Sequence, residues 1–254
     1  MDIHLVSTWG FTEDDLTALR KTSGVGQVNG GYSTDCIVQK GDKRPVFKVY
    51  SLPGQGEQNQ PKPMEGRLPQ SDSECVIEYL DPNGTYQNGT RPYTIGDTIT
   101  MTQEQGDQTI GDKLHRDAFT IVGFVRSPLY LSFERGSTSL GSGDVSYYMM
   151  VRPGVFCAQR YTDAYVQTSE TVSGLSPYSD RYDQTVESLK TTLKTVGNKR
   201  LQDNYDQIKK DGQEQIDDAK DQLSDAQNTF DTQIAQGEQQ IAESEKKLAS
   251  GRAE

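Results

Sequence analysis

The C-terminal part of the chain contains one helical pattern twice, and the spacing of the copies restricts what this segment can fold into. DGQEQIDDAKDQL begins at Asp211, and a similar stretch, QGEQQIAESEKKL, begins at Gln236. The residues that match, 25 positions apart, are Gly212 and Gly237, Ile216 and Ile241, and Leu223 and Leu248. Seven turns over this repeat give about 3.57 residues per turn, between a coiled coil and a free helix. The pattern predicts a long, nearly straight helix with one apolar stripe.

The apolar stripe extends beyond the repeat in both directions. From Ser176 onward, apolar residues alternate spacings of three and four, and Ser176, Ser179 and Pro177 are suitable helix-start residues. The first part of the stripe contains Tyr182, Val186, Leu189, Leu193 and Val196. We expect Gly197 and Asn198 to kink or briefly interrupt the helix. The residues beyond that point that we expect to face a partner helix, the seam, are Gly212, Ile216, Leu223, Phe230, Ile234, Gly237, Ile241 and Leu248.

This stripe calls for a partner that the chain does not supply. From Lys199 to Glu254 a helix would run about 80 Å, too far to fold back on a compact domain. Each seam glycine costs about 1 kcal/mol relative to alanine, a cost that close approach of a second helix would offset. The simplest partner is a return helix, antiparallel, following Glu254. The alternative is a solvated single helix or a disordered acidic tail.

Composition excludes several classes of protein. Hydrophobic residues make up 32% of the 254 residues, which predicts a modest core and much solvated surface. The formal net charge of −11 would repel a phosphate backbone, and the clustered cations lie among as many acids, so no nucleic acid partner is expected.

Residues with the chemistry for catalysis or metal binding are few and scattered. His4 and His115 have no metal-ligand spacing, and the sequence lacks HExxH, GxSxG and EF-hand patterns. GVGQVNGG at 24–31 resembles a dinucleotide loop but follows a helix instead of a strand, so a helix stop with a turn is the better interpretation. We expect no enzyme activity, no catalytic residue, no cofactor and no metal.

The three cysteines do not form a recognisable framework. Cys36, Cys75 and Cys157 lie far apart, and their odd number leaves at least one thiol free. Burial as small apolar residues in strands is the favoured interpretation, and a Cys36–Cys75 bridge is left open.

No stretch of the sequence reaches the length of a membrane span. AFTIVGFV at 118–125 is the longest nearly apolar run, against roughly 20 residues for a transmembrane helix. Met1 leads directly into a strand pattern, and the helical pattern continues into the last residues. We therefore expect the chain to be a piece of a larger protein.

The first 180 residues predict an α+β fold. DIHLVSTWG alternates like a strand, and a short helix at 12–22 follows, capped by Thr12 with Asp15 and ended by Gly24. A hairpin that turns at Gly41 and Asp42 comes next. Further short strands are expected in SECVIEYL, DTITM, DAFTIVGFV, VSYYMMV and DAYVQTS. The loop at 81–92 carries two formal glycosylation patterns, at Asn83 and Asn88, to which we attach little weight.

These elements should form two lobes. We expect the first strand and helix to pack with DAYVQTS and the helix after Ser179, and residues of about 65–150 to supply most of the second lobe. The expected domains are therefore a core at 1–180 and a coiled-coil stalk at 181–254.

Several stretches in order resemble one family. STWGFTEDDLTALRKTSGVGQVNGGYSTD resembles the opening of the extracytoplasmic core domain of MacB-like, FtsX-type ABC transporter permeases. MEGRLPQSDSECVIEYL, YTIGDTITM and FTIVGFVRSPLYLSFERGSTSLGSGDVSYYMMV resemble later strands of that domain. The segment YSDRYDQTVESLKTTLKTVGNKRL resembles the coiled-coil insertion of the large permeases of Gram-positive bacteria. The long helical insertion departs from MacB itself.

The resemblance implies a two-lobed extracellular domain at the cell membrane of a bacterium, expected to be Gram-positive. It implies partners outside this chain: membrane helices of the same permease, a cytoplasmic ABC ATPase subunit, and a permease homodimer or pseudo-dimer. The stalk would engage its return helix or an extracellular protein. The competing hypothesis is a secreted or surface-anchored structural protein, such as an adhesin, with a coiled-coil spacer.

Overall fold

The computed structural model describes residues 2–79, 91–102, 109–130, 135–176 and 178–251. They form an α+β fold that divides into two compact units, Met1–Gly197 and Asn198–Glu254. The glycosylation patterns at Asn83 and Asn88, and Pro177, lie outside the described residues.

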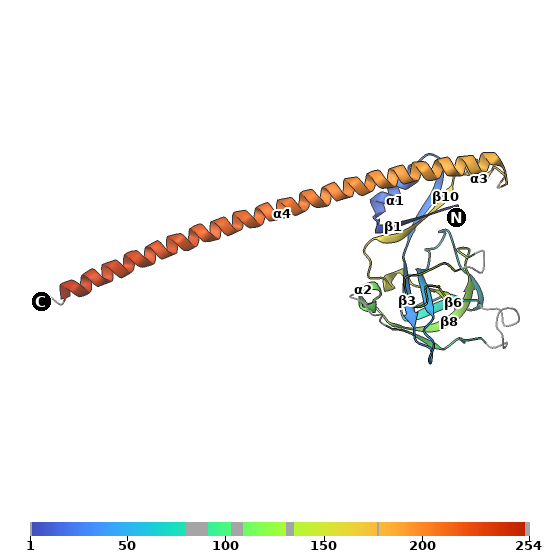
Figure 1. Cartoon of the computed structure of the whole chain (residues 1–254), viewed down its shortest axis with the longest axis horizontal. Helices are drawn as coiled ribbons and strands as arrows, with labels where there is room; N and C mark the ends of the chain where they lie inside the picture. The colour runs from blue at the N-terminus through green and yellow to red at the C-terminus, as the bar shows by residue number, and fades with distance from the viewer. Residues whose placement is uncertain (1, 80–90, 103–108, 131–134, 177, 252–254) are drawn as a thin grey trace. The chain divides into compact units, whose positions relative to one another are not determined.

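The first lobe of unit Met1–Gly197 is a three-stranded antiparallel sheet. Its strands, in spatial order, are β1 (Ile3–Phe11), β10 (Tyr161–Thr168) and β2 (Val25–Gly31). Figure 1 shows α1 (Glu13–Arg20) and the first turns of α4 (Asp180–Gly251) beside this sheet. The short helix α3 (Glu170–Ser173) follows β10. This is the grouping that the apolar patterns predicted.

The core of this lobe is built from the sheet and both helices. Leu16 and Leu19 of α1 are buried, as their spacing predicted. The buried residues that pack together are Ile3, Leu16, Leu19, Val28, Ala164, Val166, Val172, Val186, Leu189 and Leu193. At about 1.5–3 kcal/mol for each large apolar side chain, this cluster accounts for much of the favourable free energy of folding of the lobe.

The start of α1 is fixed by a capping box. The Thr12 hydroxyl accepts a hydrogen bond from the Asp15 N–H at 3.2 Å, and the Asp15 carboxylate accepts one from the Thr12 N–H at 2.9 Å. This confirms the predicted cap. The helix ends at Arg20, two residues before the expected end at 22, and Gly24 follows in a left-handed conformation with φ +88°.

The segment at 24–31 corrects one expectation. After Gly24 it is strand β2, whereas we expected a helix stop with a turn. Two of its glycines are required by the neighbouring strand, because a Cβ at Gly30 would lie 2.5 Å from the Tyr161 ring and one at Gly31 would lie 2.7 Å from the Tyr165 ring. The glycine-rich composition therefore reflects rings of β10 lying across the backbone of β2.

The second lobe is a seven-stranded mixed sheet with the order β5-β8-β6-β9-β4-β3-β7. Strand β7 also pairs with β8, so the sheet closes on itself. The strands are β3 (Ser33–Val38), β4 (Val46–Ser51), β5 (Lys62–Gly66), β6 (Glu74–Glu78), β7 (Thr98–Thr102), β8 (Ala118–Arg126) and β9 (Tyr147–Val151). Residues 62–151 supply five of these, and the hairpin β3–β4 supplies the other two.

The hairpin turns where the sequence predicted, with Lys40 bridged to Lys43 and Gly41 at φ +57°. Three short elements in this region were not predicted: β5, α2 (Ile110–Lys113) and the 3-10 helix η1 (Pro153–Val155). All five residues of β5 are exposed, so this strand has no apolar alternation to reveal it.

Helix α4 runs from Asp180 to Gly251 without interruption. The Ser179 hydroxyl accepts the N–H of Tyr182 at 3.2 Å, which is one of the predicted caps. The expected break at Gly197 and Asn198 is absent, because Gly197 keeps helical hydrogen bonding at a cost of about 1 kcal/mol that the neighbouring turns absorb. The two compact units divide at this glycine, so the first turns of α4 belong to the core unit.

Two ion pairs bind arginine side chains to the two ends of strand β6. The guanidinium groups of Arg67 and Arg135 each hold a carboxylate with two nitrogens, those of Glu74 and Glu78 respectively, at 2.6–2.8 Å. Hydrogen bonds from the Arg67 side chain, and then from the backbone N–H of Gln70, lower the pKa of Glu74 from 4.5 to about 2. Stabilisation from this pair is therefore complete above pH 4.5 and is lost as the pH falls through about 2.

We expect Glu74→Gln to destabilise the core at pH 7 and to have progressively less effect toward pH 2, where the native carboxyl is itself protonated. Thermal melts followed by circular dichroism at pH 7, 4.5, 3 and 2 measure this. Glu13→Gln, which removes the exposed pair of Glu13 with Arg20, serves as the control. The prediction would be contradicted if the melting temperature of Glu74→Gln stayed below that of the native protein by the same amount at every pH.

Candidate functional site: the exposed seam of helix α4

One apolar stripe follows α4 and changes its environment along the helix. Leu193 is 1% exposed and packs in the core of the first lobe, whereas Leu223 is 68% exposed and Phe230 is 61% exposed. The large apolar residues of unit Asn198–Glu254 that are exposed are Leu201, Tyr205, Ile208, Ile216, Leu223, Phe230, Ile234, Ile241 and Leu248. This set contains every apolar residue of the predicted seam. Isolated exposed apolar residues are ordinary, whereas a row of them along one side of a helix is a candidate surface for a partner.

Two glycines interrupt the row of side chains. A Cβ added at Gly212 or Gly237 would meet no atom within 4 Å. Neither glycine is therefore required by packing within the part of the chain that the structure describes. Each lowers helix stability by about 1 kcal/mol, and both lie on the seam, where a missing side chain allows a second helix to approach closely.

The flanks of the seam differ in charge. Positions seven apart lie on the same side of the helix, so Asp231, Glu238 and Glu245 form an acidic row beside the seam. The opposite flank carries the uncharged amides Gln215, Gln222, Gln233 and Gln240, and Lys247 follows on it. All eight residues are exposed. Between residues 231 and 245 an acidic flank and an amide flank thus border the apolar stripe, whereas one 25-residue repeat earlier Lys220 takes the place of Glu245.

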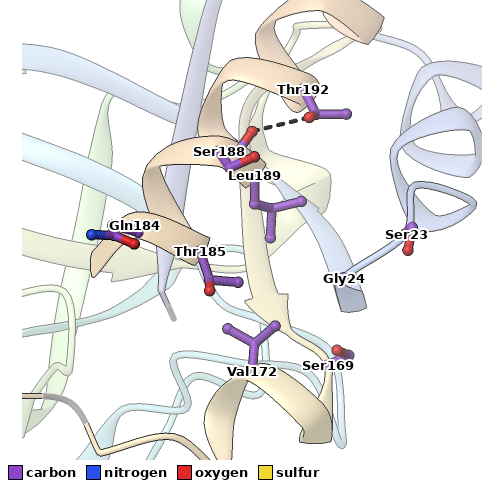
Figure 2. A pocket seen from close by; sticks show the side chains of 9 residues that line it. All are labelled: Ser23, Gly24, Ser169, Val172, Gln184, Thr185, Ser188, Leu189 and Thr192. Atoms are coloured by element: carbon purple, nitrogen blue, oxygen red, sulfur yellow. Dashed lines mark hydrogen bonds between the residues drawn. The ribbon is translucent and has the colours of Figure 1, made fainter. Parts of the chain in front are cut away.

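A separate groove lies within the core unit, between α4 and the α1–β2 connection. It has a volume of about 550 Å³. Figure 2 shows the hydroxyls of Ser23, Ser169 and Thr185 around the apolar side chains of Val172 and Leu189. The Thr192 hydroxyl, also on its wall, donates to the Ser188 carbonyl at 3.0 Å. None of the nine lining residues is charged, so the groove suits a neutral surface and offers no acid or base for catalysis.

The two histidines, which the sequence left apart, each have a polar partner. His4 Nε2 lies 2.7 Å from the Asp163 carboxylate, and the Thr162 hydroxyl donates to the same carboxylate. Burial opposes ionisation of Asp163, but the hydrogen bonds from His4 and Thr162 outweigh it and lower the pKa of this carboxyl. The pair joins β1 to β10 across the sheet, and sequence reasoning missed it because 159 residues separate the two side chains.

The cysteines are free thiols. Burial raises the pKa of Cys36 to about 12 and raises that of Cys75 as well, which keeps both protonated and unreactive. The Cys36–Cys75 bridge that the sequence left open is therefore not formed. Cys157 Sγ lies 3.4 Å from His115 Nδ1 and donates to the Gly111 carbonyl, a contact between segments 42 residues apart that no sequence motif signals.

Among the described residues, no group of three or more histidine, cysteine or acidic side chains is arranged to hold a metal ion. In the same part of the chain, none of the helices combines the length and the apolar character that crossing a membrane requires.

Two solved structures are similar to this chain. One is the extracellular domain of the noncanonic ABC-type transporter YknZ from Gram-positive bacteria, with a TM-score of 0.36, 14% identity, and coverage of 71% of this chain and 80% of that chain. The other is the periplasmic region of MacB from Actinobacillus actinomycetemcomitans, with a TM-score of 0.35, 14% identity, and coverage of 76% of each chain. No protein-family model and no curated protein matches.

The first of these structures is an extracellular domain and the second a periplasmic region.

Two leucines of one helix provide a test of the seam. We expect Leu193→Asp to destabilise the first lobe by about 3 kcal/mol or more, because a charge enters a closed core. Leu223→Asp should change the free energy of unfolding of the core unit by less than about 0.5 kcal/mol, because the native side chain is exposed. Denaturant titration of both variants measures this. Equal destabilisation by the two substitutions would show that Leu223 is already covered.

Proposed function

We propose that this chain is a noncatalytic extracellular domain of an ABC transporter permease. In this proposal ATP-driven motion of the membrane part is relayed through the core to a stalk, formed by α4, that engages a partner. The observation that carries the proposal is the continuity of α4, whose apolar stripe is buried at Val186, Leu189 and Leu193 and exposed from Leu201 onward. In this proposal the buried part of the stripe anchors the helix, and the exposed part binds the partner.

The ordered resemblance of the sequence motifs to MacB-like permeases supports the membrane setting. The relevant partners are the membrane helices of the same permease, the cytoplasmic ABC ATPase, and a second permease subunit in a homodimer or pseudo-dimer. We place the domain on the extracellular face of the cell membrane, in a Gram-positive bacterium, with the core at 1–180 and the stalk at 181–254, the first turns of the stalk up to Gly197 being packed into the core unit.

The seam residues, Gly212, Ile216, Leu223, Phe230, Ile234, Gly237, Ile241 and Leu248, are proposed to pack against an antiparallel return helix that lies outside residues 1–254. A helix of this length in water needs tertiary packing to stay rigid. Because the described residues leave the seam exposed, this packing has to come from elsewhere.

Cell fractionation tests the membrane setting. We expect an antibody against the core to find the protein in the membrane fraction and accessible to protease from outside the cell, because the proposal places the core beyond the bilayer. After gentle detergent extraction, an ATP-binding subunit should copurify with it. Recovery in the cell wall or the medium without an ATPase would favour the structural, adhesin-like protein instead.

A helix break tests the relay. Gly197→Pro should remove a helical hydrogen bond and kink α4 at the junction of the two units, at a local cost of about 3 kcal/mol. In the full-length permease we expect it to abolish coupling between the stalk partner and ATP hydrolysis, while the partner still binds the stalk. ATPase rates with and without the partner measure the coupling.

Gly197→Ala is the matched control, because it keeps the helix and adds only a methyl group, for which nothing lies within 4 Å. Normal coupling in Gly197→Pro would argue against a relay through α4.

A further inference from the structure

The seam lies on the most acidic part of the helix. Between residues 211 and 245 the chain contains ten acids and one lysine. The acids are Asp211, Glu214, Asp217, Asp218, Asp221, Asp225, Asp231, Glu238, Glu243 and Glu245, and the lysine is Lys220. Packed helices lie about 8–10 Å apart, which is about one Debye length at physiological salt, so charges on two such helices act on each other.

This charge disfavours a second copy of the helix as the occupant of the seam. Two copies would pair helices that each carry ten acids and one lysine between residues 211 and 245, with Asp231, Glu238 and Glu245 beside the seam. In an antiparallel pair of copies like flanks meet, so in a register centred on Glu238 the row Asp231, Glu238 and Glu245 would face its own equivalent. Like charges placed opposite each other destabilise an interface and exclude that partner.

We propose that the occupant is a basic amphipathic helix, the return helix of the stalk. It carries lysines and arginines on the flank that faces Asp231, Glu238 and Glu245. Its other flank, which faces Gln215, Gln222, Gln233 and Gln240, is polar and uncharged, because amide groups donate and accept hydrogen bonds without selecting a charge. The inference rests on the proposed function, since it gives the chemistry of the partner helix proposed there.

The two glycines also set the size of the partner's side chains at two positions. Opposite Gly212 and Gly237 the partner presents its larger apolar side chains, which fill the space that the two glycines leave open. The partner repeats these positions with the same 25-residue spacing, because a seam of this period keeps facing one side over its whole length. The occupant is thus defined by an apolar repeat, a basic flank and a neutral flank.

Three synthetic peptides test the proposal against the full 254-residue chain. All have the same apolar repeat, and their flank positions are lysine, glutamine or glutamate. In fluorescence anisotropy at 50 mM NaCl we expect the lysine peptide to bind about tenfold tighter than the glutamine peptide and the glutamate peptide to bind weakest. At 500 mM NaCl the advantage should shrink to less than about threefold. A lysine peptide with a scrambled apolar repeat should not bind.

Two triple variants of equal net charge locate the effect. Asp231→Lys, Glu238→Lys and Glu245→Lys together reverse the acidic row beside the seam and should remove the preference for the lysine peptide. The control set, Glu214→Lys, Asp221→Lys and Asp225→Lys, lies on the far side of the helix and should change the affinity by less than about threefold. If both triple variants lost the same amount of affinity for the lysine peptide, the attraction would depend on net charge and not on the acidic row, and the proposal would be overturned.

The other outcomes separate this inference from the proposed function. Equal binding of all three flank peptides, abolished by Leu223→Asp, would retain the helix-binding seam and overturn the basic partner. No binding of any peptide would overturn both. Sedimentation as a dimer without peptide, reversed by Leu223→Asp, would identify a second copy as the occupant and overturn the basic partner.

Discussion

The packing of Val186, Leu189 and Leu193 against the three-stranded sheet is the interaction on which the rest of the structure depends. These side chains turn the start of α4 into part of the core, together with Leu16 and Leu19 of α1. Without that anchor the helix would have only its intrinsic propensity to hold it, which is marginal in water even for favourable sequences. Because the first turns are fixed, the nucleation cost is already met, and each later residue adds a hydrogen bond to an existing helix.

The same stripe of apolar residues therefore has two different roles along one helix. Up to Val196 it contributes to folding, because the sheet and α1 cover it. From Leu201 onward it contributes little to the stability of the described chain, because these side chains are largely exposed to water. Residues that do not stabilise their own fold, yet keep a regular period over 25-residue repeats, are best explained by an interaction with another helix. The seam glycines point the same way, since they lower the stability of the helix that carries them.

The sequence predicted the elements whose signals are local. The cap at Thr12, the turn at Gly41 and the periodic stripe of α4 all depend on neighbours within a few residues, and each was found where it was predicted. What it did not predict depends on distant contacts. Strand β5 exists only because β8 supplies its hydrogen bonds, and the His4–Asp163 pair needs β1 beside β10. The glycines at 30 and 31 were misinterpreted because the rings that cross them come from a strand more than a hundred residues later.

The distribution of charge along α4 also constrains the alignment of a partner. Residues 199–210 contain four cations and two acids, whereas residues 211–245 contain ten acids and one cation. A partner helix that is basic throughout would meet repulsion beside Lys199, Arg200, Lys209 and Lys210. The favourable partner is therefore basic along the acidic stretch and neutral or acidic where it passes these four cations. An apolar seam alone would also accept a partner shifted by one 25-residue repeat, with one copy of the repeat left unpaired, since Ile241 and Leu248 then take the places of Ile216 and Leu223. The change of charge near residue 211 removes that degeneracy, because a shifted partner would place its basic segment away from the acids and its neutral end over them.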